Sequence, residues 1–283
     1  MSRLDNKLIE KLKEYFYGRE DVIMAFIFGS YATNQVHSES DMDIAVYFKP
    51  ESSRMVEIET AKQYQNEDEI WASVEKISGI NTDLVVLNRA RSTLSFNILK
   101  KGLPLSIKDR DTYLKFYLAV SAEAEEFRGF VKDYWEIYQR SRSLSDTDKT
   151  RLMEILHFMD TEIKEFPLYK EMDFKKFKND KFFRRNVERW TETLTMALMD
   201  TAKIIMSSSN QEMPETYYNC LLEFGMFIKL SEDETRRLAG YAKLRNILVH
   251  EYLDIRFGRI REFIDTAYPL YVAVIDKVKK MIE

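Results

Sequence analysis

The sequence has few of the residues that mark disulfide-stabilised, turn-rich or membrane-spanning proteins. Its 283 residues include one cysteine, Cys220, with eight glycines and five prolines. A single cysteine excludes an internal disulfide framework and fits a reducing compartment, and the scarcity of glycine and proline favours long helices over an all-β fold. No apolar run approaches the roughly 18 residues of a membrane span, and the N-terminal stretch lacks the apolar core of a signal peptide. We therefore expect a cytoplasmic protein without a membrane partner.

The chain also lacks an excess of charge of either sign. Its 43 basic and 47 acidic residues give a formal net charge of −4. No global field therefore attracts nucleic acid, and any RNA contact must come from a local basic patch. The length exceeds that of a usual single domain, so we expect two domains.

The first part of the sequence alternates between strand and helix patterns. An amphipathic helix pattern is followed by short apolar runs at 22–28, 42–48 and 82–87, each typical of a buried strand. The segment 51–78 has a charged, helical pattern, and a further helical stretch ends at Gly102, where a helix C-cap is expected. These patterns predict a small mixed-sheet domain over residues 1–110.

From residue 111 onward the patterns are helical. One long helix and a polar linker are expected over 111–146, where Ser145 and Asp148 have capping-box spacing. We expect an all-α helical bundle over 147–283, so the predicted fold class is α+β with an all-α second domain. The expected helices of this bundle cover about 147–165, 180–208, 214–228, 232–250 and 257 to the end.

The stretch FGSYATNQVHSESDMDIAV (28–46) carries the residue types of a nucleotide site. Alternate side chains of a strand share one face, so Asp41 and Asp43 would lie about 7 Å apart as an oxygen-rich site that suits Mg²⁺. Gly29 leaves room for a phosphate, and Ser30 can donate its hydroxyl near the start of the next helix. Asp83, at the start of the third strand, could complete a two-metal arrangement. A plain turn and a solvated strand start are the alternative interpretation of the same residues.

This stretch resembles the active-site signature of the DNA polymerase β-type nucleotidyltransferases. NTDLVVLNRA (81–90) and LSFNILKKGLPL (94–105) resemble the third-strand region of the smallest branch, the minimal (MntA-like) nucleotidyltransferases. The resemblance implies that Asp41 and Asp43 bind Mg²⁺ and the triphosphate of ATP or another NTP. It implies that Asp83 is the third metal-binding carboxylate and helps to deprotonate the attacking hydroxyl, and that Gly29 and Ser30 hold the phosphates.

A second group of polar residues lies in AKLRNILVHEYLDI (242–255). On a helix, Asn246 and His250 are one turn apart, so Asn246 could orient the imidazole. An arginine that holds a phosphodiester, here Arg245, and a histidine that moves a proton are the minimum for metal-independent RNA cleavage. Arg-x4-His arises often by chance, so the spacing alone leaves a capping or core role for His250 open.

RNILVHEYLDI resembles the Arg-x4-His-x-Tyr signature of HEPN ribonucleases, and in particular HepT-like toxins. The resemblance spans about 147–283 and implies that Arg245 and His250 are catalytic, with Asn246 supporting. It also implies a homodimer that cuts RNA, such as tRNA, in a shared cleft. In the related toxin–antitoxin pairs, the nucleotidyltransferase silences the nuclease by attaching AMP to the tyrosine of His-x-Tyr, a position that Tyr252 holds.

Together these patterns predict a fused toxin–antitoxin-type enzyme. Its Mg²⁺-dependent nucleotidyltransferase would transfer AMP from ATP to Tyr252 and so silence RNA cleavage. One alternative is an antibiotic (aminoglycoside-type) adenylyltransferase with a helical substrate or dimerisation domain. Another is a helical half that only dimerises or presents a substrate.

The segment DFKKFKNDKFFRRNVERW (173–190) interleaves basic and aromatic residues. Basic side chains can grip phosphates while aromatic rings stack on unpaired bases. The same pattern is typical of a polar helix face whose aromatic residues lie in the core, and we favour that interpretation from the sequence.

Overall fold

A computed structural model describes residues 5–33, 40–50, 56–60, 62–140, 143–244 and 253–282. The chain divides into two compact units, Met1–Glu126 and Phe127–Glu283. The division falls inside α5 (Arg110–Arg140), so each unit contains a part of this helix. The domain bounds expected from the sequence, 1–110 and 147–283, stay a prediction.

The first unit is built on a four-stranded mixed sheet. Its strands are β1 (Val22–Phe28), β2 (Met42–Phe48), β3 (Thr82–Val86) and β4 (Leu103–Ile107). The order is β3-β2-β1-β4; β1 is antiparallel to β2 and β4, whereas β2 and β3 are parallel. Three strands follow the apolar runs of the sequence, and β4 was not expected.

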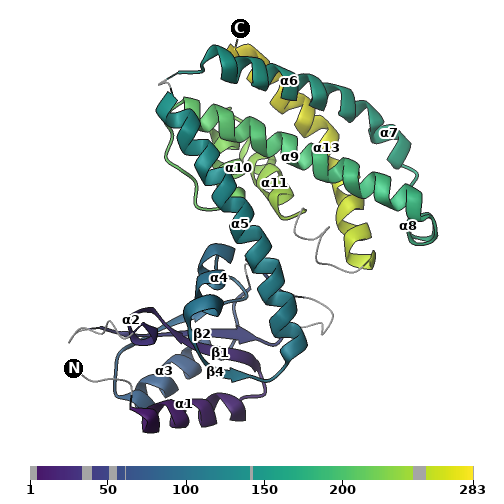
Figure 1. Ribbon diagram of the computed structural model, residues 1–283. Coiled ribbons are helices and arrows are strands. Elements are labelled where there is room, and N and C mark those ends of the chain that lie inside the picture. Colours follow the sequence, from purple (N-terminus) through teal and green to yellow (C-terminus); the bar gives the residue numbers. More distant parts are fainter. Residues whose placement is uncertain are drawn as a thin grey trace. The chain divides into compact units, whose positions relative to one another are not determined.

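Helices cover both faces of this sheet (Figure 1). The buried side chains of α1 (Asn6–Gly18) and α3 (Glu67–Ser78) pack on one face. Those of α4 (Ser92–Lys101) and of the first part of α5 pack on the other. The helix α2 (Gly29–Ala32) directly follows β1. The nucleotidyltransferase candidates therefore lie on a sheet that is packed on both sides.

The helical pattern expected over 51–78 was wrong for the described first part of that segment. Residues 56–60 and 62–66 are not helical, and only α3 is. The backbone of this segment bonds to distant partners: the Glu57 amide donates to the Tyr47 hydroxyl at 2.8 Å, and the Thr60 amide donates to the Asn88 carbonyl at 3.0 Å. Backbone groups that are bonded across the fold cannot close helical turns.

The second unit is helical in its described part. Its helices pack around α9, whose residues from Val187 to Ser208 include many that are fully buried. Capping side chains set several helix starts, among them the capping box of Ser231 and Glu234. The elements are α6 (Asp146–Glu162), η1 (Ile163–Glu165), α7 (Phe166–Tyr169), α8 (Phe174–Asn179), α9 (Lys181–Ser208), α10 (Tyr217–Phe227), α11 (Glu232–Gly240), η2 (Tyr241–Lys243) and α13 (Leu253–Ile282).

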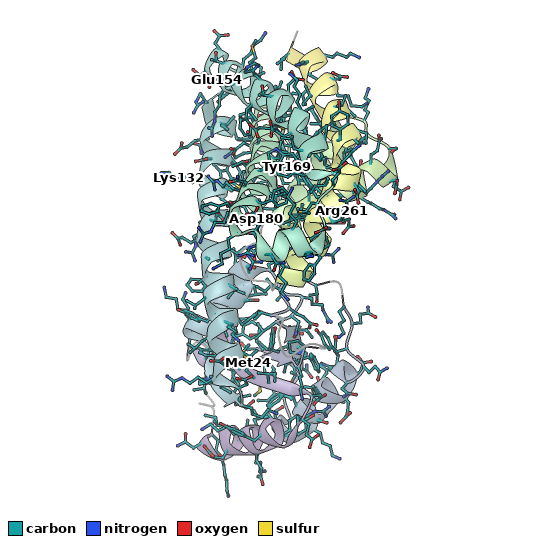
Figure 2. The ribbon with its side chains drawn as sticks, turned by 90° about the vertical axis from the view of Figure 1, so that its right-hand side faces the viewer. Met24, Lys132, Glu154, Tyr169, Asp180 and Arg261 are labelled. Carbon is teal, nitrogen blue, oxygen red and sulfur yellow. The ribbon has the colours of Figure 1, made fainter. Side chains whose placement is uncertain are left out.

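Polar contacts fix the ends of these helices to one another. Arg261 of α13 donates to the Met172 carbonyl at 3.2 Å, and Figure 2 shows Arg261 and Tyr169 on neighbouring elements. The nearly buried Lys203 of α9 contacts Asp133 at 3.0 Å and Asp200 at 2.8 Å, so its charge is compensated.

The single helix expected over 232–250 was wrong in its described part, because α11 ends at Gly240 and a 3₁₀ turn follows. The fold class is confirmed: a small mixed sheet with helices, followed by a helical region. Within the described ranges, none of the helices combines the length and apolar character that crossing a bilayer requires.

Candidate functional site

The parallel pairing of β2 and β3 brings two of the candidate carboxylates together. Asp43 and Asp83 are register partners, and Asp41 lies two residues before Asp43. Their neighbours two and four residues further along the strands, such as Ala45 and Leu87, pack under α4 and α5. Side chains at every second position share a face, so the three carboxylates belong to the α4 side of the sheet, at one end of it.

The carboxylate of Asp43 is the most enclosed of the three. Asp43 is half-buried, whereas Asp41 and Asp83 are exposed. Burial raises the pKa of Asp43 above its ordinary value, and the negative charges of Asp83 and then Asp41 raise it further. The arrangement concentrates negative charge where a cation would relieve the repulsion.

Gly29 approaches the same carboxylate from β1. The preceding residue, Phe28, is the register partner of Asp43, and Gly29 has a φ of +66°. An added Cβ at Gly29 would lie 2.0 Å from Oδ2 of Asp43. A side chain at this position would thus meet both backbone strain and a clash with the carboxylate. Only glycine leaves the space beside Asp43 open.

The short helix α2 is tied to the start of β2. The Tyr31 hydroxyl donates to the Ser40 carbonyl at 3.2 Å, and the Thr33 hydroxyl donates to the Gly29 carbonyl at 3.1 Å. Ser30, which directly precedes Tyr31, is half-buried. The sequence reasoning missed Tyr31 and Thr33: the Tyr31 contact spans nine residues, and the Thr33 contact joins residues four apart. These bonds hold Gly29 and the residue before Asp41 in place.

A small cavity adjoins Gly29. It has a volume of about 140 Å³ and is lined in part by Gly29, Thr33, Asn97 and Lys101. The exposed Lys101, the charged residue of this lining, comes from the last turn of α4. The sequence reasoning did not assign it a role, although KKG directly precedes β4. A lysine beside an open glycine backbone offers a countercharge for a phosphate.

The donor set of Asp41, Asp43 and Asp83 consists of hard carboxylate oxygens, which Mg²⁺ prefers over nitrogen or sulfur. The described residues hold no group of three or more His, Cys, Asp and Glu side chains already arranged around a metal position. Protein sites for Mg²⁺ commonly use one or two carboxylates and complete the shell with phosphate oxygens and water. The residues present fit such a shared shell.

The second group of candidates lies outside the described residues. Arg245, Asn246, His250 and Tyr252 fall between η2 and α13, in the sequence of the second unit. Of the two other histidines, His37 also lies outside the described ranges, and His157 is exposed on α6.

Two family models match the chain. Residues 10–111 match Polymerase beta, Nucleotidyltransferase, and residues 159–278 match Ribonuclease HepT-like. A curated relative, the tRNA nuclease HepT of Aphanizomenon flos-aquae (strain 2012/KM1/D3), is 33% identical over 92 residues, which is 31% of this chain and 63% of the relative. The match thus spans less than two thirds of that relative's length.

Solved structures that match part of the chain include one described as a toxin–antitoxin with AMP-PNP. It is 23% identical, covers 44% of this chain and 91% of its own, and has a TM-score of 0.34. A mutant of the toxin–antitoxin MntA-HpeT is 21% identical, with a TM-score of 0.33; this match also covers 44% of the present chain and 91% of the other.

Proposed function

Because this chain joins a polymerase β-type nucleotidyltransferase domain to a HepT-like ribonuclease domain, we propose that it is a self-silencing ribonuclease of the toxin–antitoxin type. The first domain transfers AMP from ATP to Tyr252, and the second cleaves RNA until that tyrosine is modified. The organisation supports an enzyme in which one half controls the other.

The observation that carries the transfer reaction is the convergence of three carboxylates beside an open glycine. Asp43 is paired with Asp83 across β2 and β3, and the space that a side chain at residue 29 would fill lies against Asp43. Asp41 adds to the electrostatic effect on the Asp43 pKa. A site with this charge needs a cation before it can accept a triphosphate.

In the proposed reaction, the hydroxyl oxygen of Tyr252 forms a bond to the α-phosphorus of ATP. The bond between that phosphorus and the bridging oxygen of the β-phosphate breaks, and pyrophosphate leaves. Asp83 accepts the hydroxyl proton, while Gly29, Ser30 and Lys101 hold the phosphates. Mg²⁺ bound by Asp41, Asp43 and Asp83 would supply charge neutralisation, on which phosphoryl-group transfer largely depends.

The ribonuclease half uses Arg245 to hold the phosphodiester and His250, oriented by Asn246, to move the proton of the attacking 2′-hydroxyl. These roles rest on the match to the HepT-like model, which includes all three residues. We also propose that the chain forms a homodimer through this half and that it is located in the reducing cytoplasm. AMP on the tyrosine two residues after His250 would add a phosphate where the RNA phosphate must bind, and like charges repel.

Fusion of the two halves has a quantitative consequence. Enzyme and target tyrosine occur in equal numbers, and a tether gives effective concentrations of roughly millimolar order where it allows the two to meet. Modification within a chain, or between two chains of a dimer, therefore needs no separate partner protein.

The proposal is tested by intact-mass spectrometry. The purified chain is incubated with ATP and Mg²⁺, beside the Asp41→Ala/Asp43→Ala double variant and Tyr252→Phe, after the starting mass of each has been read. We expect a gain of AMP units that both variants abolish. A chain that starts unmodified and stays so would overturn the proposal, and adenylylation of an added aminoglycoside would favour the antibiotic-modifying alternative.

A further inference from the structure

The corner between α8 and α9 concentrates positive charge in an otherwise acidic chain. Residues 173–189 contain seven basic and three acidic side chains, a net charge of +4, whereas the whole chain carries −4. Within the described part of the chain, no ion pair involves Lys175, Lys178 or Lys181, and all three are exposed. The corner is therefore a source of uncompensated positive charge.

The backbone of this corner is firmly anchored. Phe177 of α8 is fully buried and packs against Phe257 of α13, with the ring centroids 5.6 Å apart. Arg184 donates to the carbonyls of Phe177 and Lys178 at 3.3 and 3.1 Å and so closes the end of α8. Lys176 lies over the Phe183 ring at 4.2 Å from its centroid. A ligand at this corner would meet a pre-formed surface, which lowers the entropic cost of binding.

Phe182 is the most exposed aromatic residue of the segment. Phe177 and Trp190 lie in the core, as the plain interpretation of the sequence required, but Phe182 is 81% exposed. Burial of a benzyl group contributes about 1.5–3 kcal/mol relative to leaving it exposed. A ligand that covers the Phe182 ring would therefore gain part of this free energy. The flat face of the ring suits a stacking partner.

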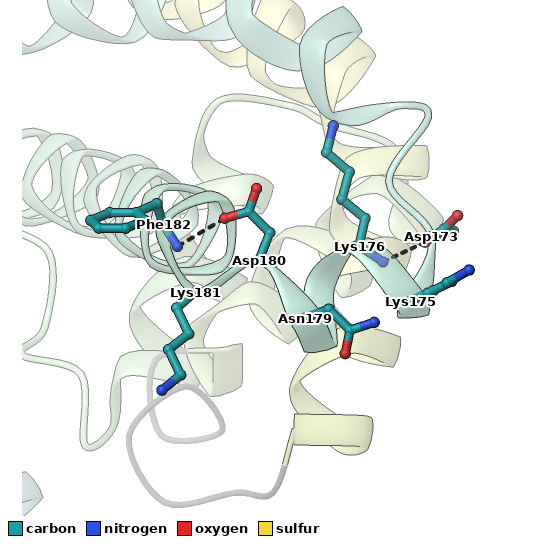
Figure 3. Close-up of a pocket in the computed structure, with 7 residues that line it drawn as sticks. All are labelled: Asp173, Lys175, Lys176, Asn179, Asp180, Lys181 and Phe182. Atoms are coloured by element: carbon teal, nitrogen blue, oxygen red, sulfur yellow. Dashed lines mark hydrogen bonds between the residues drawn. The ribbon is translucent and has the colours of Figure 1, made fainter.

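A shallow pocket of about 670 Å³ opens at this corner, lined by Lys175, Lys176, Lys181 and Phe182 together with Asp173, Asn179 and Asp180. Asp180 caps α9 by accepting from the amides of Phe182 and Phe183, each at 3.0 Å. These amides are therefore not free for an anion, and the lysine side chains must hold it. Figure 3 shows the three lysines extending in different directions from the corner.

We propose that the α8–α9 corner binds a single-stranded segment of RNA, with one base stacked on Phe182 and the backbone phosphates following Lys175, Lys178 and Lys181. Cations spread over a wide, open surface suit a chain of phosphates better than a single phosphate ion. The exposed ring adds affinity that a charge-only surface lacks. The inference rests on the proposed function only in taking RNA as the substrate of the second domain.

The test measures binding by fluorescence anisotropy of a labelled, unstructured RNA. The full chain carries His250→Ala, so that the RNA is not consumed. Phe182→Ala should weaken binding about tenfold, since stacking contributes about 1–3 kcal/mol per base, and Phe182→Trp should preserve it. Lys175→Gln/Lys181→Gln should lower the slope of log affinity against log salt by about 1.4, or roughly 0.7 per lost contact to a single strand.

The matched control is Lys279→Gln/Lys280→Gln, which removes two exposed lysines from the end of α13 and should leave affinity and slope unchanged. Parent-like binding by both corner variants would overturn this inference alone. If Phe182→Ala changed only the oligomeric mass in light scattering, the corner would be a protein interface, and the inference would fall. No RNA binding by a parent whose intact mass shows no attached AMP would overturn the ribonuclease half as well. Because the assay contains no ATP, a failure of AMP transfer leaves its result unaffected.

Discussion

The carboxylate cluster of the first unit and the α8–α9 corner of the second are electrostatic opposites, and we propose that both bind phosphate-containing ligands. Asp41, Asp43 and Asp83 gather negative charge that a cation must neutralise before a triphosphate can bind. The corner presents lysines that can bind phosphates directly. The comparison teaches that a phosphate site built from carboxylates requires a metal ion, whereas a phosphate site built from lysines does not.

The two surfaces also differ in how they are built. The carboxylates are assembled by strand register, which joins residues 43 and 83. The corner is assembled by local helix caps within one short stretch, where Asp173 bonds the Lys176 amide and Asp180 bonds the Phe182 amide. Substitutions should therefore separate the two surfaces cleanly.

The largest effect is expected for Asp43→Asn, which removes the carboxylate that touches the Gly29 position. We expect AMP transfer to fall by about 100-fold or more, as is typical when a group that stabilises transition-state charge is lost. RNA affinity at the α8–α9 corner should not change. Initial rates with radiolabelled ATP and anisotropy on the same samples check both. A parallel loss of both activities would mean that the substitution disturbs the whole chain.

Gly29→Ala should have the next largest effect on transfer. Its Cβ would lie 2.0 Å from Oδ2 of Asp43, so the carboxylate must move. Gly79→Ala is the matched control, because Gly79 has a φ of +68° with nothing within 4 Å of an added Cβ. Left-handed strain should cost each variant about 1–2 kcal/mol of unfolding free energy, measured in urea, and the clash should add to this loss in Gly29→Ala. Only Gly29→Ala should slow transfer; equal rates in the two variants would count against a role for this glycine.

Lys101→Ala should act more weakly. Loss of one countercharge for the phosphates should raise the KM for ATP about tenfold with little change in kcat, since the contact serves binding. Lys100→Ala is the control: this lysine lies over the Phe96 ring, at 5.7 Å from its centroid, and not in the cavity lining. Steady-state kinetics of the three proteins decide the point, and an unchanged KM for Lys101→Ala would exclude this assignment.

The smallest expected effects are on the stability of the fold. Ionisation of Asp21 stabilises it, whereas ionisation of Asp43 destabilises it. The guanidinium of Arg19 lowers the pKa of Asp21 from its ordinary 3.8 to about 2. Ionised Asp21 thus stabilises the fold above about pH 4, and this contribution is lost as the pH falls through about 2. The pKa of Asp43 is raised, so its ionised form destabilises the fold at neutral pH, and the penalty disappears on acidification.

Thermal melts should therefore show a lower Tm for Asp21→Asn and a higher Tm for Asp43→Asn at pH 7 without metal. The Asp21→Asn difference should shrink between pH 4 and pH 2. A shift of the same sign in both variants would show that the environments of the two carboxylates differ from those described.

The local patterns of the sequence were sufficient for most elements but not for β4. Three strands are largely apolar in sequence, whereas β4 contains Pro104, which argues against a central strand. The proline is tolerated because β4 is an edge strand, bonded to β1 alone. Proline has no backbone N–H to donate, which is tolerated on the side of an edge strand where no further strand pairs. Whether β4 lies at the edge follows only from the order of the strands in the sheet.

The candidate site was predicted from the sequence to the extent that it depends on local spacing. The spacing of Asp41 and Asp43 follows from strand alternation, but the register that joins Asp43 to Asp83 is set by pairing across the sheet. The cavity beside Gly29 includes Lys101, more than seventy residues away, for the same reason. Similarly, the aromatic residues of 173–190 have one pattern in the sequence, and only packing separates the buried Phe177 from the exposed Phe182.

The central claim, that one half of the chain silences the other, is tested most directly by RNA cleavage before and after incubation with ATP and Mg²⁺. The parent chain, purified unmodified, should cleave a labelled RNA and lose this activity as its mass rises by AMP. Asp43→Asn should cleave equally well under both conditions. Cleavage by the parent that persists after AMP has been attached, or a loss of cleavage with ATP in Asp43→Asn as well, would contradict the account.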